Sequence, residues 1–176
     1  MSNAATLTSL LDDLRACLCA TLEAADADTP CLCALTAGAS FTADYCGCKG
    51  GGGCGSSWVR LSDLYASRNF PSPDNTVSGS CASPLAAVIE VGVLRCLPQP
   101  NPRTGAPPSQ ADLTNAALAA LSDASAIHSA IACCSAVTDR RHVLGRYRPI
   151  TSGDCGGGAW TVTVQVSPLP TVTPAG

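Results

Sequence analysis

Cysteine is the residue type in this sequence with the widest chemical repertoire. Its sulfur can ligate a metal ion, attack an electrophile as a thiolate, or form a disulfide. Twelve of the 176 residues are cysteines, and three of them lie in one glycine-rich stretch, DYCGCKGGGGCGSSWVRL at 44–61. Six cysteines could form a cluster, as metal ligands or as disulfide partners: Cys46, Cys48, Cys54, Cys31, Cys33 and Cys155.

The spacing of these cysteines argues against a zinc site. Zinc ligands of a knuckle are usually separated by about two to four residues, so that both sulfurs turn toward the ion. Cys31 and Cys33 have one residue between them, as do Cys46 and Cys48. On a strand this spacing puts the two sulfurs of a pair on opposite faces. We therefore expect neither a metal ion nor another cofactor.

Oxidation is the favoured alternative where glycines let the backbone turn. Disulfides are expected to involve some of four residues: Cys46, Cys48, Cys54 and Cys155. A free cysteine otherwise behaves as a small buried hydrophobe, and Cys17 and Cys134 are expected to be of this kind. A chain made in the cytosol would form its disulfides after it leaves the cell.

Groups for general acid, general base or nucleophilic catalysis are sparse. His128 lies in a predicted helix and His142 in a basic turn, and nothing local marks one cysteine as activated. The glycine runs lack the spacing of a phosphate-binding loop. Glu90 lies inside a predicted strand, where its charge needs a partner, and Arg60 or Arg95 on a neighbouring strand or subunit could supply one. We expect no enzymatic activity, and a zinc- or thiol-dependent enzyme is the remote alternative.

Two helices are predicted to position these residues. Leucines recur at three- and four-residue steps over 7–22, which indicates an amphipathic helix. Ser109 followed by Asp112 resembles a capping box and predicts the start of a long helix, about 109–137. Its expected apolar stripe consists of Leu113, Ala117, Leu121, Ala124, Ile127 and Ile131.

Short apolar or alternating runs predict the strands, at 31–36, 41–46, 58–61, 84–96, 142–147 and 160–166. Glycines predict a turn at 153–158, and five prolines make 97–108 a stiff connector. This order predicts an α+β fold, with a mostly antiparallel sheet packed against the N-terminal helix and the long helix. One domain is expected over 1–167, followed by a flexible proline-rich tail at 168–176.

The charge content of the sequence limits its partners. The net charge is −3, so binding to DNA through phosphate neutralisation is not expected. No stretch has the continuous apolar length of a membrane span, and no membrane contact is expected. Only 13% of the residues are charged, about half the usual share, which indicates burial against other subunits.

The order of these motifs resembles a family of small virion proteins of actinobacterial long-tailed (siphovirus) phages. The family belongs to the head-to-tail connection genes and is similar to the tail terminator. The resemblance extends to about residue 167, and its motifs are PCLC at 30–33, DYC at 44–46, GCG at 53–55, WVRL at 58–61, FPSPD at 70–74, LAAVIEVGVLRC at 85–96, PPS at 107–109 and WTVTV at 160–164.

The resemblance implies a structural protein of the virion neck, assembled in the host cytoplasm. Copies would close into a homohexameric ring that caps the tail tube and joins it to the head. Its partners would be the chain itself, the major tail tube protein and the head-completion or stopper protein, with DNA passing through the lumen without specific binding. The connector 97–108 and the loop 66–83 would contact neighbours or the tube. A head-to-tail adaptor or stopper is the alternative.

Overall fold

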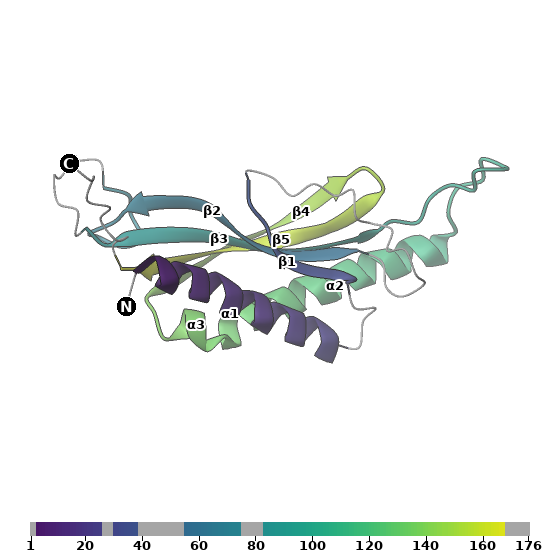
Figure 1. The fold of residues 1–176 in the computed structure, drawn as a ribbon. Coiled ribbons are helices and arrows are strands. Elements are labelled where there is room, and N and C mark those ends of the chain that lie inside the picture. The colour runs from purple at the N-terminus through teal and green to yellow at the C-terminus, as the bar shows by residue number, and fades with distance from the viewer. Residues whose placement is uncertain (1–2, 26–29, 39–54, 75–82, 168–176) are drawn as a thin grey trace, which may run out of the picture.

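The fold is a single mixed sheet with helices on one face (Figure 1). The computed structural model describes residues 3–25, 30–38, 55–74 and 83–167. Within these residues the elements are, in order, α1 (Asn3–Ala24), β1 (Leu32–Leu35), β2 (Ser56–Ala66), β3 (Leu85–Cys96), α2 (Gln110–Cys133), α3 (Ser135–Thr138), β4 (His142–Ser152) and β5 (Cys155–Val166). The predicted α+β class is confirmed. The strand predicted at 41–46 and the tail at 168–176 lie outside the described residues.

The sheet has the strand order β1-β2-β3-β5-β4. The β2–β3, β3–β5 and β4–β5 pairs are antiparallel, and β1 alone runs parallel to its neighbour β2. The sheet is therefore mostly antiparallel, as predicted. β3 is central, and its pairing with β5 runs without a break from Leu85 opposite Val166 to Cys96 opposite Cys155. This continuous ladder makes β3 the rigid axis of the sheet.

Alternation along β3 separates two environments. Ala87, Ile89, Val91 and Val93 are fully buried and belong to the core between the sheet and the helices. On the opposite face Gly92 lies across from Trp58 of β2. A Cβ atom at Gly92 would overlap the Trp58 ring, so glycine is needed here for the indole to pack against β3.

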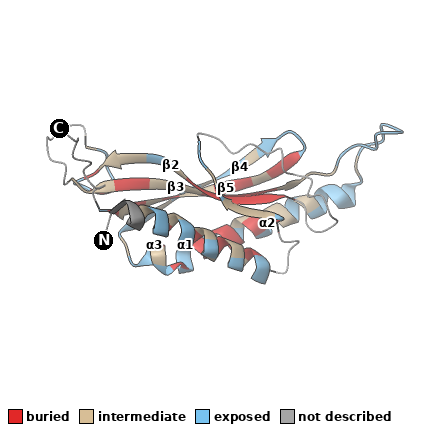
Figure 2. Ribbon diagram, viewed as in Figure 1, coloured by how far each residue is buried: buried red, intermediate tan, exposed pale blue. Residues whose placement is uncertain are grey.

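α1 covers this core with one stripe of leucines. Leu10, Leu14, Leu18 and Leu22 are at most 1% exposed, at the four-residue steps that place side chains on one helix face. The opposite side carries ordinary solvent-facing charges such as Asp12 and Asp13, and Figure 2 shows the two faces in red and pale blue. The predicted N-terminal helix is confirmed, and its burial follows the hydrophobic period.

α2 confirms its predicted start but not all of its predicted stripe. Ser109 is the N-cap, and its hydroxyl oxygen accepts a hydrogen bond from the Asp112 amide at 3.1 Å. The helix ends at Cys133, since Cys134 is extended (φ −77°, ψ 117°) before α3 begins, so the predicted helix to 137 is interrupted. Leu113 and Leu121 were predicted to be core residues, yet they are 52% and 67% exposed.

The exposure of these leucines has a simple geometric cause. The buried residues of α2 begin only at Asp123 and continue with Ala126, Ile127, Ala130 and Ile131. The second half of the helix therefore packs on the sheet, while the first half leaves its side chains exposed at the end of the molecule where α2 begins (Figures 1 and 2).

The predicted glycine turn at 153–158 is shorter than expected. The β4–β5 turn is confined to Gly153 and Asp154, and β5 begins at Cys155. Gly156 to Gly158 continue the strand. A Cβ atom at Gly157 would overlap the Val93 carbonyl oxygen of the adjacent β3. A Cβ atom at Gly156 or Gly158 would instead overlap the side chain of Leu97 or Tyr147. These three glycines therefore allow close packing within the sheet, while Gly153 (φ 55°) forms the turn.

Candidate functional site

Two of the predicted ionic residues pair across neighbouring strands. Arg60 of β2 and Glu90 of β3 are register partners on the face opposite the helices. Arg60 Nε and Nη2 donate to the two Glu90 carboxylate oxygens at 2.7 and 2.9 Å, and Trp58 Nε1 donates to Glu90 Oε1 at 3.0 Å. Arg60 Nη1 also donates to the Gly38 carbonyl oxygen at 2.8 Å. The bidentate geometry fixes both side chains.

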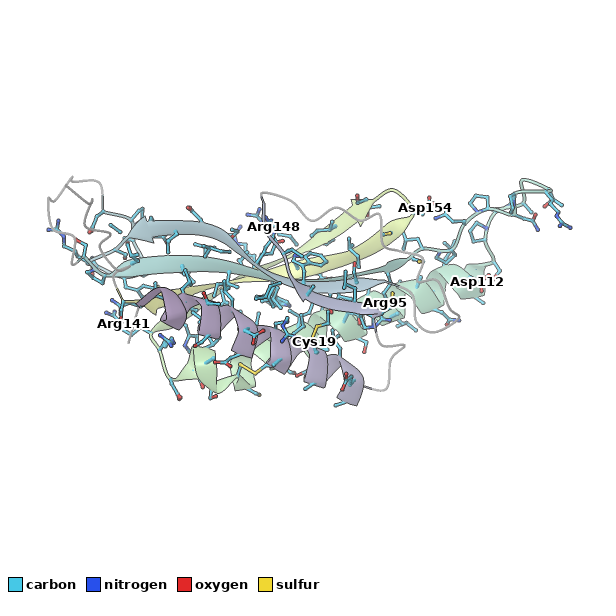
Figure 3. The ribbon with its side chains drawn as sticks, in the orientation of Figure 1. Cys19, Arg95, Asp112, Arg141, Arg148 and Asp154 are labelled. Carbon is cyan, nitrogen blue, oxygen red and sulfur yellow. A yellow bond between two sulfur atoms is a disulfide. The ribbon has the colours of Figure 1, made fainter. Side chains whose placement is uncertain are left out.

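This network sets the ionisation of Glu90. Burial is the largest single influence and raises the pKa of Glu90, but the hydrogen bonds from Arg60 and Trp58, with the charges of Arg60 and Arg148, outweigh it. The pKa of Glu90 is therefore lowered below its ordinary value of 4.5. Figure 3 labels Arg148 on this same side of the sheet.

We expect Glu90→Gln to weaken the loss of stability in acid. Because the pKa of Glu90 is lower in the folded than in the unfolded chain, its carboxylate stabilises the fold above pH 4.5. That contribution is lost as the pH falls through the folded-state pKa. Urea unfolding at several pH values between neutral and acid gives the slope of the free energy of unfolding against pH. Glu23→Gln, on the exposed side of α1, controls for the change in net charge. Equal slopes for Glu90→Gln and the unaltered chain would contradict the prediction.

The third predicted ionic residue, Arg95, pairs with a helix residue. Arg95 Nη2 donates to Asp123 Oδ1 at 2.7 Å, and Arg95 Nε donates to the second carboxylate oxygen. The Asp123 side chain is 3% exposed and that of Arg95 13%. This buried pair joins the end of β3 to the middle of α2, where the helix first packs on the sheet.

Both pairs therefore form within one chain. The sequence interpretation gave Glu90, Arg60 and Arg95 as candidates for ion pairs, including pairs between subunits, and it left a neighbouring strand or subunit open as the source of the partner of Glu90; the neighbouring strand β2 supplies it through Arg60. The reason is register: β2 and β3 bring Arg60 opposite Glu90. Asp123 was not predicted at all. Its only sequence signal is a lone carboxylate among small and apolar residues in the second half of a helix.

The cysteines form disulfides that cross-link separate elements. Cys17 of α1 bonds to Cys134 at the α2–α3 junction, 117 residues away, and Cys19 of α1 bonds to Cys33 of β1. The expectation of buried free thiols at Cys17 and Cys134 was wrong, because the extended backbone at Cys134 brings its side chain against α1. Figure 3 labels Cys19 beneath the sheet.

The remaining cysteines of the predicted cluster fall into two groups, those in disulfides and those outside the described residues. Cys31 and Cys155 are also disulfide-bonded. Cys46, Cys48 and Cys54 lie outside the described residues. Within the described part of the chain, no three His, Cys, Asp or Glu side chains gather as metal ligands could. His128 instead contacts Trp160, with ring centroids 5.5 Å apart and the ring planes tilted by 57°.

The connector between β3 and α2 forms a projecting arm, defined as residues 97–108. Every residue from 99 to 107 is exposed, and the arm extends beyond the sheet in Figure 1. Its tip is a closed turn: the Asn101 amide donates to the Ala106 carbonyl at 2.9 Å, and the Gly105 amide to the Asn101 carbonyl at 2.8 Å. The Asn101 side-chain oxygen accepts from the Arg103 amide at 2.9 Å. The predicted stiff connector is thus an ordered loop.

A groove of about 940 Å³ lies between the base of this arm and the first half of α2. We call it the arm-side groove. Its helix wall includes Leu113, Ala116 and Ala120, and its sheet wall includes Ile150 and Gly157. Figure 3 labels Arg95 and Asp112 at this end of the molecule, and both side chains line the groove. Most of the lining of the arm-side groove is therefore apolar.

The outer side of α2 lacks the charges of an ordinary surface helix. From Leu113 to Cys133 the one charged residue is Asp123, and that residue is buried. Leu118 is 59% exposed, in addition to the two leucines that leave the core. α1 carries Asp12, Asp13, Arg15 and Glu23 over a similar length. The presence of a single charged residue between Leu113 and Cys133 was the sequence signal that could have identified this surface.

α2 also meets the length and composition of a membrane-spanning helix, unlike the other described helices. Core helices of globular proteins satisfy the same two conditions. The second half of α2 packs against the sheet, and its Asp123 pairs with Arg95. The apolar residues in the second half of α2 therefore serve to pack the helix against the sheet.

Comparisons with known proteins place the chain in no family. No protein-family model matches it, and no curated protein gives a significant match. The surface formed by the arm, the arm-side groove and the uncharged side of α2 is therefore the feature on which a functional interpretation depends.

Proposed function

We propose that this chain is a structural protein of a phage neck, a tail terminator whose copies form a homohexameric ring. The ring would cap the tail tube, contact the head-completion or stopper protein, and let DNA pass through its lumen without specific binding. The chain would act in the virion after assembly in the host cytoplasm, with no enzymatic step.

The observation that carries this proposal is the largely exposed stretch of α2 from Leu113 to Ser122, which bears three leucines and no charged residue. An exposed apolar surface of this kind is typical of a face that another protein covers. An ordered arm adjoins it at the same end of the molecule, so each copy has two different surfaces to offer. Contacts between unlike surfaces close into rings when the rotation between copies fits.

Native mass spectrometry and electron microscopy of the purified, oxidised chain test the proposal. We expect rings of six copies of the 17.7 kDa chain, either alone or after addition of tail tube protein. A chain that remains monomeric at all concentrations and with tube protein would rule out the ring. Assembly at the head side of the neck, away from the tube end, would instead assign the chain as an adaptor or stopper.

A further inference from the structure

We propose that the arm of one copy docks in the arm-side groove of a second copy, and that this contact links the subunits. The inference rests on the proposed function, since it names the surfaces through which the ring would close. It commits to a second copy of this chain as the occupant of the groove.

The arm is suited to insertion because it is already ordered. Its five prolines restrict the backbone, and the hydrogen-bonded turn from Asn101 to Ala106 closes its tip. An element fixed before binding loses little conformational entropy when it docks. The exposure of residues 99–107 leaves this surface available to a neighbour.

The groove is suited to a short peptide segment with little charge. Its two charged lining residues already have contacts within the chain, Arg95 with Asp123 and Asp112 with the Ser109 hydroxyl at 2.7 Å. The remaining walls consist mostly of leucine, alanine, isoleucine, proline and glycine. Seven of the twelve arm residues are proline, alanine or glycine, and these residues match such walls in polarity.

Charge complementarity favours a second copy over an unrelated peptide. Arg103 is the one charged residue of the arm. Within the groove the Arg95 charge is balanced by Asp123, whereas Asp112 contributes a negative charge that its hydroxyl contact does not neutralise. Arg103 on the arm would thus meet Asp112 at the groove. Such a charge pair contributes more to the correct position of the arm in the groove than to the affinity of the contact.

The direction of the arm makes the contact one between copies. The tip projects past the first turn of α2 and away from the body of its own chain (Figure 1). An arm that reaches the next copy leaves its own groove open for the arm of the previous copy. This contact between unlike surfaces repeats around a ring and lies at one rim of it.

Photo-crosslinking tests the contact directly. The probe p-benzoylphenylalanine replaces Thr104 at the exposed arm tip, and this chain is mixed and co-assembled with a ¹⁵N-labelled chain that lacks the probe. We expect cross-links from Thr104 to ¹⁵N peptides that contain residues 112–120, which can arise only between copies. The same probe at Asp63, exposed on β2, should give no cross-link to these peptides. Cross-links from Thr104 that map elsewhere overturn the inference.

Two matched variants test the contribution of the groove. Leu113→Glu places a carboxylate on the groove wall, and Val143→Glu places one at a residue 44% exposed on β4, outside the groove. We expect Leu113→Glu to raise the concentration needed for association by at least about tenfold, because burial of an unpaired carboxylate is unfavourable. Val143→Glu should retain association, and circular dichroism should show both variants folded.

The outcomes separate the two proposals. A monomeric unaltered chain overturns the ring and the contact together. An unaltered chain that forms rings, with Leu113→Glu forming them equally well, overturns the contact and leaves the proposed function in place. A chain that forms only dimers with the expected cross-links supports the contact and overturns the ring.

Discussion

Asp123→Ala is expected to lower the free energy of unfolding by about 3–5 kcal/mol, because removal of one partner of a buried ion pair strands the other charge. Asp123 and Arg95 are both largely buried, and both carboxylate oxygens accept hydrogen bonds from the guanidinium. A typical domain is stable by about 5–15 kcal/mol, so this loss is a large part of the total. Urea denaturation without reductant measures it.

Two controls identify the cause of that loss. Combining Asp123→Leu with Arg95→Met removes both charges and is expected to recover most of the stability, since apolar replacements of a buried pair are often neutral. Asp12→Ala breaks the exposed pair of Asp12 with Arg15 and should cost less than about 1 kcal/mol. The prediction fails if Asp123→Ala is no more destabilising than Asp12→Ala.

Loss of the Cys17–Cys134 disulfide is the second large effect expected. In the chain-entropy model, a bond that closes a loop of about 100 residues stabilises by about 4.7 kcal/mol, and one that closes about 15 residues by about 3 kcal/mol. The sequence separations here are 117 and 14. The paired change Cys17→Ala with Cys134→Ala is therefore expected to destabilise more than Cys19→Ala with Cys33→Ala, by about 1.5–2 kcal/mol.

Reductant provides the control for this comparison. Urea unfolding of the two variants and the unaltered chain is measured first under oxidising conditions and then with dithiothreitol. The three curves should converge after reduction, since every loop is then open. An unaltered chain whose unfolding is insensitive to dithiothreitol would contradict the prediction, as would a greater loss from the shorter loop.

The sequence predicts those features of the fold that depend on local patterns. Ser109 is found as the N-cap because its hydroxyl acts on an amide three residues away. β3 is found because it is a long apolar run with one wholly apolar face. The mid-strand charge of Glu90 indicated a partner, and a strand neighbour provides it. Each of these features needs few residues and little knowledge of distant packing.

Features that depend on how distant segments meet were not predictable. α2 is so rich in alanine and leucine that its period does not mark one face, and the sheet contacts only its second half. The Cys17–Cys134 bond joins residues far apart in sequence, and pairing among twelve cysteines cannot be derived from their order. The groove forms only when β3, β4, β5 and α2 are placed relative to one another, and no single segment of the sequence determines that placement.

The two disulfides whose partners are described both run from α1 to another part of the same polypeptide, one to β1 and one to the end of α2. Each of these two bonds stabilises one chain and links no chain to another copy. If copies of the chain assemble in a reducing cell, as proposed, and are then released into oxidising surroundings, the two bonds would form after assembly. Because these two bonds lie within a chain, they would add nothing to the resistance of contacts between copies to detergent.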